Sequence, residues 1–321
     1  MTTTTWVIGG RGLLGRALTA EIQRRAGWAL LEAEPLDWHN PTRLASQVRS
    51  ATKALLAAAG GGDWAIIWAA GAAVTASTQA QLDAELAQLT GILNEIGSQL
   101  VSSTSTGIVF YSSSAGGVYG GSADPPFNEA TVPVPISPYG EFKLRSERAV
   151  TEFSRTNGLS SLIGRIANLY GPGQKLDKMQ GLISQIAKAQ LSTRPASIYV
   201  SLDTIRDYIY VDDCAELVCD ALDQLTMTSL GAGPTQVTKI LASGEGTTIA
   251  SLLGHFRLLS KGHPHVMLGS SASSSLQAHD LRLRSRVWPE LDRRELTTLP
   301  AGIHATILDI LAGIQLGSPR N

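Results

Sequence analysis

The sequence predicts an α/β fold, a doubly wound parallel sheet with helices packed on both faces. Through the first half of the chain, short apolar runs alternate with stretches of helical periodicity, as expected for strands and helices that follow one another in turn. A glycine-rich turn joins the first apolar run to the first helical stretch. In folds of this class, such a turn lies where ligands bind.

The expected elements follow in regular order. Strands are expected at residues 5–10, 28–33, 64–71, 107–114 and 159–171, the last leading into a loop. Helices are expected at residues 13–25, 41–60, 79–100 and 138–156. In the first helix, Leu14, Leu18 and Ile22 recur every four residues and form one apolar face. Helices of this kind cover a parallel sheet on both sides.

Length, charge and cysteine usage limit the classes of function. A chain of 321 residues can bury a large core, and a net charge of −1 gives no electrostatic reason to bind nucleic acid or an anionic membrane. Glycines and Arg11 interrupt the first apolar run, so we expect neither a signal peptide nor a membrane span. Cys214 and Cys219 are five residues apart in a helical stretch, and the six histidines are scattered. We therefore expect a cytoplasmic protein with no disulfide and no metal site.

Gly9, Gly12 and Gly15 form a GxxGxxG pattern between the first strand and the first helix. A pyrophosphate can approach such a bare turn closely, and the helix N-terminus presents free N–H groups and a positive dipole to it. The glycines could also serve only the close packing of helix on sheet. Their position ahead of alternating strands and helices favours a dinucleotide site.

The choice between NAD and NADP stays open. A carboxylate near the end of the second strand would bind the adenosine 2′-hydroxyl of NAD, and Glu32 and Glu34 are the candidates, with Asp37 slightly later. Arg11, inside the glycine turn, would instead suit the 2′-phosphate of NADP.

A tyrosine and a lysine share one face of the helix at 138–156. Ser137 suits the N-cap and Pro138 the first helical position, so Tyr139 lies in the first turn and Lys143 one turn later. An ammonium group beside a tyrosine favours the phenolate, so this tyrosine can exchange a proton. A serine at the end of the neighbouring strand could hold the oxygen that gains or loses it. Ser114 and Ser113 are the candidates.

Six motifs carry a resemblance to a known family. In chain order they are GGRGLLG, WAAG, SSSAGGVYG, PYGEFK, GRIANLYGP and RDYIYVDD. The chain resembles the extended short-chain dehydrogenases/reductases of the NAD-dependent epimerase/dehydratase family, which act mainly on nucleotide-linked sugars. The matching features span residues 6 to about 220.

The resemblance implies a Rossmann-type domain with a smaller, discontinuous substrate lobe. We expect residues 1–168 and 205–240 in the NAD(P)-binding domain and residues 169–204 and 241–321 in the lobe. The resemblance also implies a homodimer formed through helices 79–100 and 138–156. Leu82, Leu86 and Leu89 give the first of these an apolar stripe that core packing would explain equally well.

The resemblance assigns residues as well. It implies a catalytic set of Ser114, Tyr139 and Lys143, with Ser113, Asn168 and Arg206 at the substrate. The implied cofactor contacts are Gly9, Arg11, Gly12, Leu13, Leu14, Gly15, Glu32, Ala69, Ala70, Gly71, Tyr139, Lys143 and Ile166. Asn168 could instead shape a turn, and Arg206 could pair with Asp207. We expect Asp212 and Asp213 to cap the helix that follows them.

The chain departs from the family at one position. Many members carry the catalytic hydroxyl four residues before the tyrosine of the VYG motif, where this chain has Ala115. The positions where related dehydratases and decarboxylases carry acids hold Ala115, Gly116 and Gly117, none of which can transfer a proton. Dehydration and decarboxylation are therefore disfavoured. An NAD(P)-dependent nucleotide-sugar epimerase is the first expectation, a keto-sugar reductase the alternative, and a non-catalytic dinucleotide sensor or scaffold the alternative of another class.

Overall fold

The computed structural model of the chain describes residues 2–100, 107–176, 181–260, 265–269 and 278–316. Its largest unit is a six-stranded sheet in the order β2-β1-β3-β4-β5-β9, in which every neighbouring pair is parallel. The strands are β1 (Thr3–Ile8), β2 (Trp28–Leu30), β3 (Trp64–Trp68), β4 (Gly107–Ser114), β5 (Ser160–Ile166) and β9 (Gln236–Leu241). The strand order reverses between β1 and β3, so a binding crevice is expected at the carboxyl ends of these two strands.

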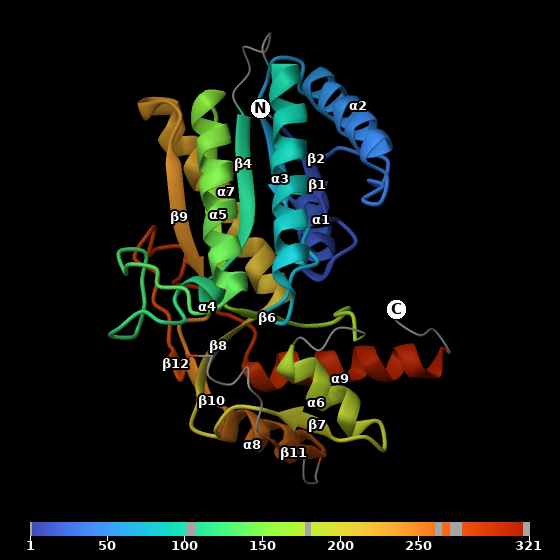
Figure 1. The fold of residues 1–321 in the computed structure, drawn as a ribbon, viewed down its shortest axis with the longest axis vertical. Helices are drawn as coiled ribbons and strands as arrows, with labels where there is room; N and C mark the ends of the chain where they lie inside the picture. The colour runs from blue at the N-terminus through green and yellow to red at the C-terminus, as the bar shows by residue number, and fades with distance from the viewer. Residues whose placement is uncertain (1, 101–106, 177–180, 261–264, 270–277, 317–321) are drawn as a thin grey trace.

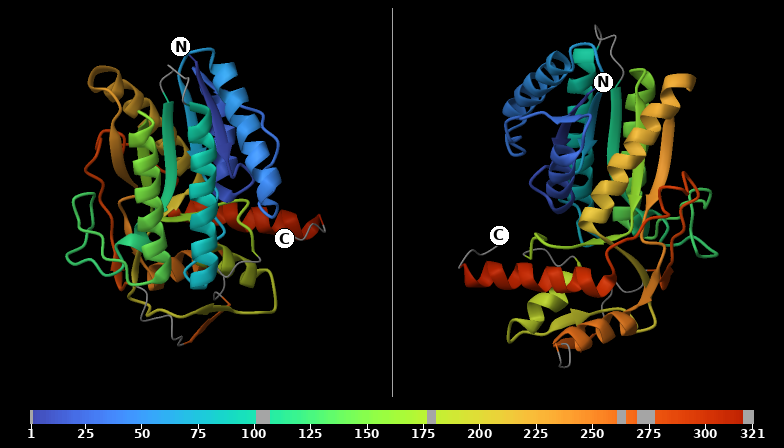
Figure 2. Two further views of the ribbon diagram at one scale, coloured as in Figure 1. Left: turned by 45° about the horizontal axis from the view of Figure 1, so that its top comes forward. Right: turned by 180° about the vertical axis from the view of Figure 1, so that it is seen from behind.

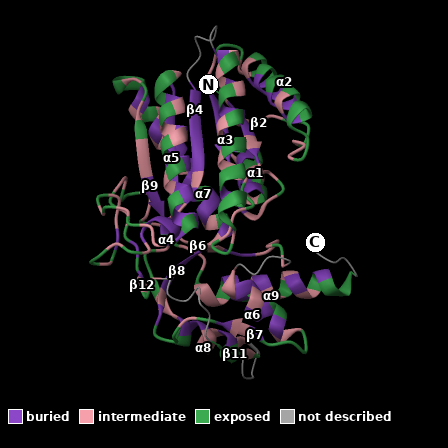
Figure 3. Ribbon diagram, in the orientation of Figure 1, coloured by how far each residue is buried: buried purple, intermediate pink, exposed green. Residues whose placement is uncertain are grey.

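Helices cover both faces of this sheet (Figures 1 and 2). They are α1 (Leu13–Arg24), α2 (Pro41–Ala59), α3 (Gln79–Leu100), α5 (Pro138–Thr156) and α7 (Val211–Ala232). Helices α2, α3 and α5 share one hydrophobic core with the sheet, and α1 and α7 share the other. Successive residues of β4 alternate between them, since Val109 packs in the first core and Phe110 in the second. Strand β4 is buried along most of its length as a result (Figure 3).

A smaller part lies beyond the carboxyl ends of these strands (Figure 1). Strand β8 (Ile205–Tyr210) pairs there with β6 (Asn168–Tyr170), β10 (Gly246–Thr248) and β12 (Asp280–Leu281). Strands β7 (Ala196–Ile198) and β11 (Val266–Leu268) form a second small sheet. The helices of this part are α6 (Leu182–Gln190), α8 (Ile249–Ser260) and α9 (Leu299–Gln315), and their apolar faces share a third core.

The helices expected from the sequence are present with bounds that agree to within one residue. Strand β2 is shorter than expected, because only Trp28–Leu30 pairs with β1. Strand β8 lies within the stretch expected in the NAD(P)-binding domain, yet it pairs only with strands outside the six-stranded sheet. Leu82 and Leu89 are buried inside the subunit.

The N-terminal end of α7 differs from the expectation based on the sequence. Helix α7 begins at the N-cap Tyr210, so the expectation that Asp212 and Asp213 cap it is wrong: both lie within its first turn. The Asp213 carboxylate accepts hydrogen bonds from the Thr297 amide and hydroxyl and so holds the segment before α9. None of the helices in the described ranges is long and apolar enough to cross a membrane.

Candidate active site

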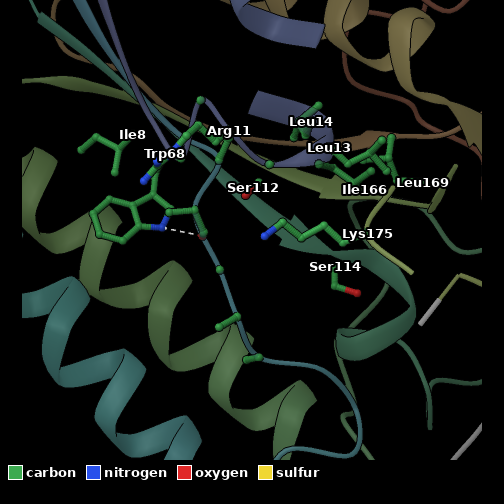
Figure 4. A pocket seen from close by; sticks show the side chains of 18 of the residues that line it. Ile8, Arg11, Leu13, Leu14, Trp68, Ser112, Ser114, Ile166, Leu169 and Lys175 are labelled. Atoms are coloured by element: carbon green, nitrogen blue, oxygen red, sulfur yellow. Dashed lines mark hydrogen bonds between the residues drawn. The ribbon is translucent and has the colours of Figure 1, made fainter. Parts of the chain in front are cut away.

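A pocket of about 980 Å³ lies between the carboxyl ends of the large sheet and the smaller part (Figure 4). It is lined by all but two of the residues expected at the site, namely Gly9, Arg11, Gly12, Leu13, Leu14, Ala69, Ala70, Gly71, Ser113, Ser114, Tyr139, Lys143, Ile166, Asn168 and Arg206. Gly15 and Glu32 do not line it. The six motifs, which are far apart in the sequence, thus converge on one cavity.

The glycine turn forms one end of this pocket. Gly9 has a φ of 91°, and a Cβ at this position would lie 2.5 Å from the Ala70 amide nitrogen, so only glycine fits there. Gly12 is the N-cap of α1, and no side chain caps this helix end. Trp68 holds the segment next to this turn by donating a hydrogen bond of 2.9 Å to the Ala70 carbonyl (Figure 4). A bare turn at an open helix N-terminus fits the pyrophosphate of a dinucleotide.

The acidic residues that could bind the cofactor ribose differ in whether they line the pocket and in whether they are already paired. Glu34 lines the pocket, but its carboxylate forms a 2.7 Å ion pair with Arg43, which also lies 3.9 Å from Asp37. Glu32 does not line the pocket, although its neighbours Leu31 and Ala33 do. Arg11 lines the pocket, is exposed, and has no hydrogen-bond or ion-pair partner among the described residues.

Tyr139 and Lys143 lie as expected on the first turns of α5. The Ser137 hydroxyl accepts a 3.2 Å hydrogen bond from the Gly140 amide, which confirms the predicted N-cap. The Lys143 ammonium donates to the Ser112 carbonyl at 3.2 Å and to the Tyr111 hydroxyl at 3.4 Å, and lies 5.8 Å from the centre of the Tyr139 ring. Burial acts to lower the pKa of Lys143, but the phenolic groups of Tyr111 and Tyr139 outweigh it and raise that pKa. The lysine is therefore a fixed positive charge beside the tyrosine.

The two candidate serines have different environments. The Ser114 hydroxyl accepts a 3.1 Å hydrogen bond from the Gly117 amide at the start of α4 (Ala115–Val118), and its proton remains available. A Cβ on Gly117 would lie 3.1 Å from the Tyr139 ring and 3.3 Å from the Ser114 oxygen, so this glycine lets the two side chains approach each other. The Ser113 side chain is buried and donates to Glu147.

Sequence reasoning missed the buried ion pair behind these serines. Arg165 of β5 donates to both carboxylate oxygens of Glu147 on α5, at 3.1 and 2.7 Å, and also donates to the Tyr119 hydroxyl at 2.7 Å. Tyr119 in turn donates to the Asn128 carbonyl. The only available signal was the position of Glu147 four residues after Lys143, which suggests a shared helix face but not a partner.

Arg206 is a buried guanidinium without a carboxylate partner in the described part of the chain. The residue is 7% exposed, and among the described residues its side chain donates only to backbone carbonyls, that of Ile205 at 2.9 Å and that of His279 at 3.5 Å. Burial lowers its pKa. It does not pair with Asp207, whose carboxylate accepts hydrogen bonds from Ser243 and Gly244. Such a group can accept an anion from the pocket.

Asn168 also lines the pocket, and it pairs with Tyr208 in the register of β6 and β8. Its side-chain nitrogen donates a 2.8 Å hydrogen bond to the Asp207 carbonyl, which ties β6 to β8. Sequence reasoning did not find Lys175, Tyr208 or Glu85, which also line the pocket. They come from three separate parts of the chain, the loop after β6, strand β8 and helix α3, so no local spacing links them.

Comparison with known proteins identifies relatives of the chain. The chain is 30% identical over 205 residues to the dTDP-4-dehydro-6-deoxyglucose reductase of Escherichia coli, an alignment that covers 63% of this chain and 61% of that relative. The chain thus spans about three fifths of the length of this curated relative.

Solved structures share the fold. The UDP-glucose 4-epimerase of Thermus thermophilus in complex with NAD has a TM-score of 0.75 at 19% identity, and the comparison covers 96% of this chain and 99% of that one. The Pseudomonas aeruginosa RMD complexed with NADPH has a TM-score of 0.73 at 22% identity, covering 96% and 98% of the two chains. The sequence model of the NAD-dependent epimerase/dehydratase family matches residues 5–229, more than half of the chain. Because this family model matches more than half of the chain, the chain belongs to the NAD-dependent epimerase/dehydratase family.

Proposed function

We propose that the protein is an NAD(P)-dependent enzyme that epimerises a nucleotide-linked sugar. One observation carries the proposal: Ser114, Tyr139 and Lys143 meet in the pocket that the glycine turn also lines. The pocket volume of about 980 Å³ leaves room for a dinucleotide and a nucleotide sugar together. Bound at the turn, NAD or NADP would supply the acceptor and donor of hydride.

In this proposal Tyr139 is the acid/base. Its hydroxyl has no hydrogen-bond partner among the described residues, so it is available to a substrate hydroxyl. The nearby charge of Lys143 stabilises the phenolate that forms when Tyr139 gives up its proton. Ser114, which Gly117 allows to approach the Tyr139 ring, holds the same substrate oxygen. Ser114 rather than Ser113 fits this role, because the Ser113 hydroxyl is committed to Glu147.

The buried guanidinium of Arg206 supports a diphosphate-linked substrate. A phosphate oxygen would compensate a charge that only backbone carbonyls now solvate. Asn168 lines the same pocket and retains its side-chain carbonyl for the substrate. In this proposal the nucleotide diphosphate lies against β6 and β8, and the sugar reaches toward Tyr139.

A keto-sugar reductase is the second candidate. The unpaired Arg11 in the turn suits the 2′-phosphate of NADPH, a hydride donor that a reductase consumes, and the E. coli relative is named a reductase. Elimination of water has less support, because Ala115, Gly116 and Gly117 offer no acid at the end of β4. A sensor or scaffold would have no need of the tyrosine, lysine and serine together.

Cofactor retention separates the two candidates. An epimerase must hold its cofactor through both half-reactions, so the purified protein should carry bound NAD and interconvert stereoisomers without added cofactor. Mass spectrometry of the released small molecules tests this directly. Stoichiometric oxidation of added NADPH with a 4-keto sugar nucleotide, and no interconversion of stereoisomers, would establish the reductase instead.

The proposal extends to the assembly. We propose the domain division stated above, a cytoplasmic location, and a homodimer through α3 and α5. These helices pack side by side, and the exposed pair of Asp83 and Arg145 joins them at 2.8 Å. Sedimentation of the purified protein tests the dimer, and a monomer at micromolar concentration would exclude it.

A further inference from the structure

The segment 69–73, which follows β3, lies between the glycine turn and the cluster that contains Tyr139. At one end, Ala70 lies so close to Gly9 that a Cβ on this glycine would come within 2.5 Å of the Ala70 amide nitrogen. At the other end, Ala73 packs against the apolar cluster to which Tyr139 belongs. A displacement of this segment would therefore affect both the cofactor turn and the surroundings of the tyrosine.

Glu85 of α3 holds this segment by its backbone. One carboxylate oxygen, Oε2, accepts hydrogen bonds from the Ala72 amide at 3.1 Å and from the Ala73 amide at 2.8 Å. A Cβ on Gly71 would lie only 3.3 Å from the other oxygen, Oε1, so glycine at this position leaves room for the carboxylate. The segment belongs to no helix or strand, so a side chain supplies partners that its amides need.

The helix fixes the position of Glu85 in turn. Leu82 and Leu89 lie three residues before it and four residues after it, on the same face of α3, and both are buried. Leu82 packs in the cluster with Tyr139, and Leu89 packs in the core that α3 shares with the large sheet. The carboxylate thus ties the segment to a rigid element that also contacts the tyrosine.

The charge of Glu85 has to be separated from its hydrogen bonds. Burial acts to lower the pKa of Lys143, whereas the neighbouring phenolic groups and the Glu85 carboxylate raise it. The Lys143 ammonium donates its hydrogen bonds to Ser112 and Tyr111 rather than to this carboxylate. The direct contacts of Glu85 are with the backbone of segment 69–73, and they favour a role in placing that segment.

We propose that Glu85 is a positioning residue, which fixes segment 69–73 so that the bound cofactor and Tyr139 keep the spacing that hydride and proton transfer require. This inference rests on the function proposed above. Spacing matters because a displacement of about 1 Å can slow an enzymatic reaction by about 10²-fold. Release of the segment should therefore slow turnover and weaken cofactor binding, while the affinity for the sugar nucleotide stays nearly the same.

Three substitutions of Glu85 test the inference, with kcat, the KM of the sugar nucleotide, and calorimetric affinity for NAD and NADP as readouts. Glu85→Ala should lower kcat by about 10-fold or more and cofactor affinity by about 5- to 30-fold, as expected for two lost hydrogen bonds, and should change the KM by less than about twofold. Glu85→Asp keeps the charge but is one methylene shorter, so it should show similar losses. Glu85→Gln keeps an oxygen at the same reach and should stay within about threefold of the wild type.

The matched control is Glu95→Ala on the same helix. It removes a surface ion pair with Arg49 and should change neither kcat nor cofactor affinity. Glu85→Asp carries the test by itself if Glu85→Ala does not fold.

Other outcomes contradict the inference. Wild-type kcat and cofactor affinity in Glu85→Ala and Glu85→Asp would refute it. An active Glu85→Asp beside an impaired Glu85→Gln would assign the effect to the charge near Lys143, and a raised KM at unchanged kcat would assign Glu85 to the substrate. If the wild type turns over no nucleotide sugar, the proposed function fails, and calorimetry with NAD and NADP still decides the role of Glu85: a loss of affinity that Gln restores supports it, and unchanged affinity refutes it.

Discussion

The Ser113 hydroxyl donates a 2.5 Å hydrogen bond to the carboxylate of Glu147, one turn beyond Lys143 on α5. Adjacent residues of a strand point to opposite sides, so the bond that fixes Ser113 also directs Ser114 toward the other side of β4. The arrangement separates a structural serine from a candidate catalytic one within two consecutive residues.

This separation predicts opposite effects for the two serines. Ser114→Ala should lower kcat far more than Ser113→Ala, because only Ser114 is free to hold a substrate oxygen. Ser113→Ala should instead lower the free energy of unfolding by about 1–3 kcal/mol, since it removes a buried hydrogen bond to a charged group. Steady-state kinetics and denaturant unfolding of both variants measure this. The reverse order in kcat would place Ser113 at the reacting oxygen.

Glu147 should be important for stability. Glu147→Gln removes the charge that compensates the buried Arg165, and we expect the free energy of unfolding to fall by about 3 kcal/mol. The matched control is Glu152→Gln on the same helix, where an exposed pair with Arg155 is lost, and it should leave the unfolding curve nearly unchanged. Equal effects in the two variants would show that the buried pair does not join β5 to α5 as the structure indicates.

Asp207 predicts a pH dependence of stability. Burial raises its pKa to about 6 from an ordinary value of 3.8, despite the hydrogen bonds from Ser243 and Gly244. The folded state therefore binds this proton more tightly than the unfolded state. The stabilisation, about 3 kcal/mol, is fully present below pH 3.8 and is lost as the pH rises through 6.

Asp207→Asn isolates this contribution from those of other carboxylates. The difference in unfolding free energy between wild type and variant should change by about 2 kcal/mol between pH 4 and pH 7, with the wild type losing stability relative to the variant as the pH rises. Urea unfolding at a series of pH values provides the measurement. Parallel curves for the two proteins would mean that Asp207 titrates at its ordinary pKa.

Local patterns predicted most of the fold. Apolar periodicity gave the helices that cover the six-stranded sheet, and capping chemistry gave the start of α5 at Ser137, because both depend on residues a few positions apart. Strand β8 could not be placed in this way. The sequence of Ile205–Tyr210 does not reveal its partners, because its pairing with β6, β10 and β12 depends on distant segments.

In the pocket too, local patterns could not predict contacts between distant segments. The spacing of Tyr139 and Lys143 is a helical repeat and was readable, whereas the choice between Ser113 and Ser114 depended on a partner, Glu147, on another element. Arg165 and Lys175 reach their places through the packing of β5 and of the loop after β6. The spacing of residues in the sequence does not predict such contacts.

The turnover of Tyr139→Phe tests the central claim most directly. The substitution removes one hydroxyl and keeps the ring packed against Phe142 and Leu82, so the fold should be unaffected. If Tyr139 is the acid/base of a nucleotide-sugar enzyme, kcat should fall by a factor of about 10² or more while substrate and cofactor still bind. Turnover close to that of the wild type would contradict the account.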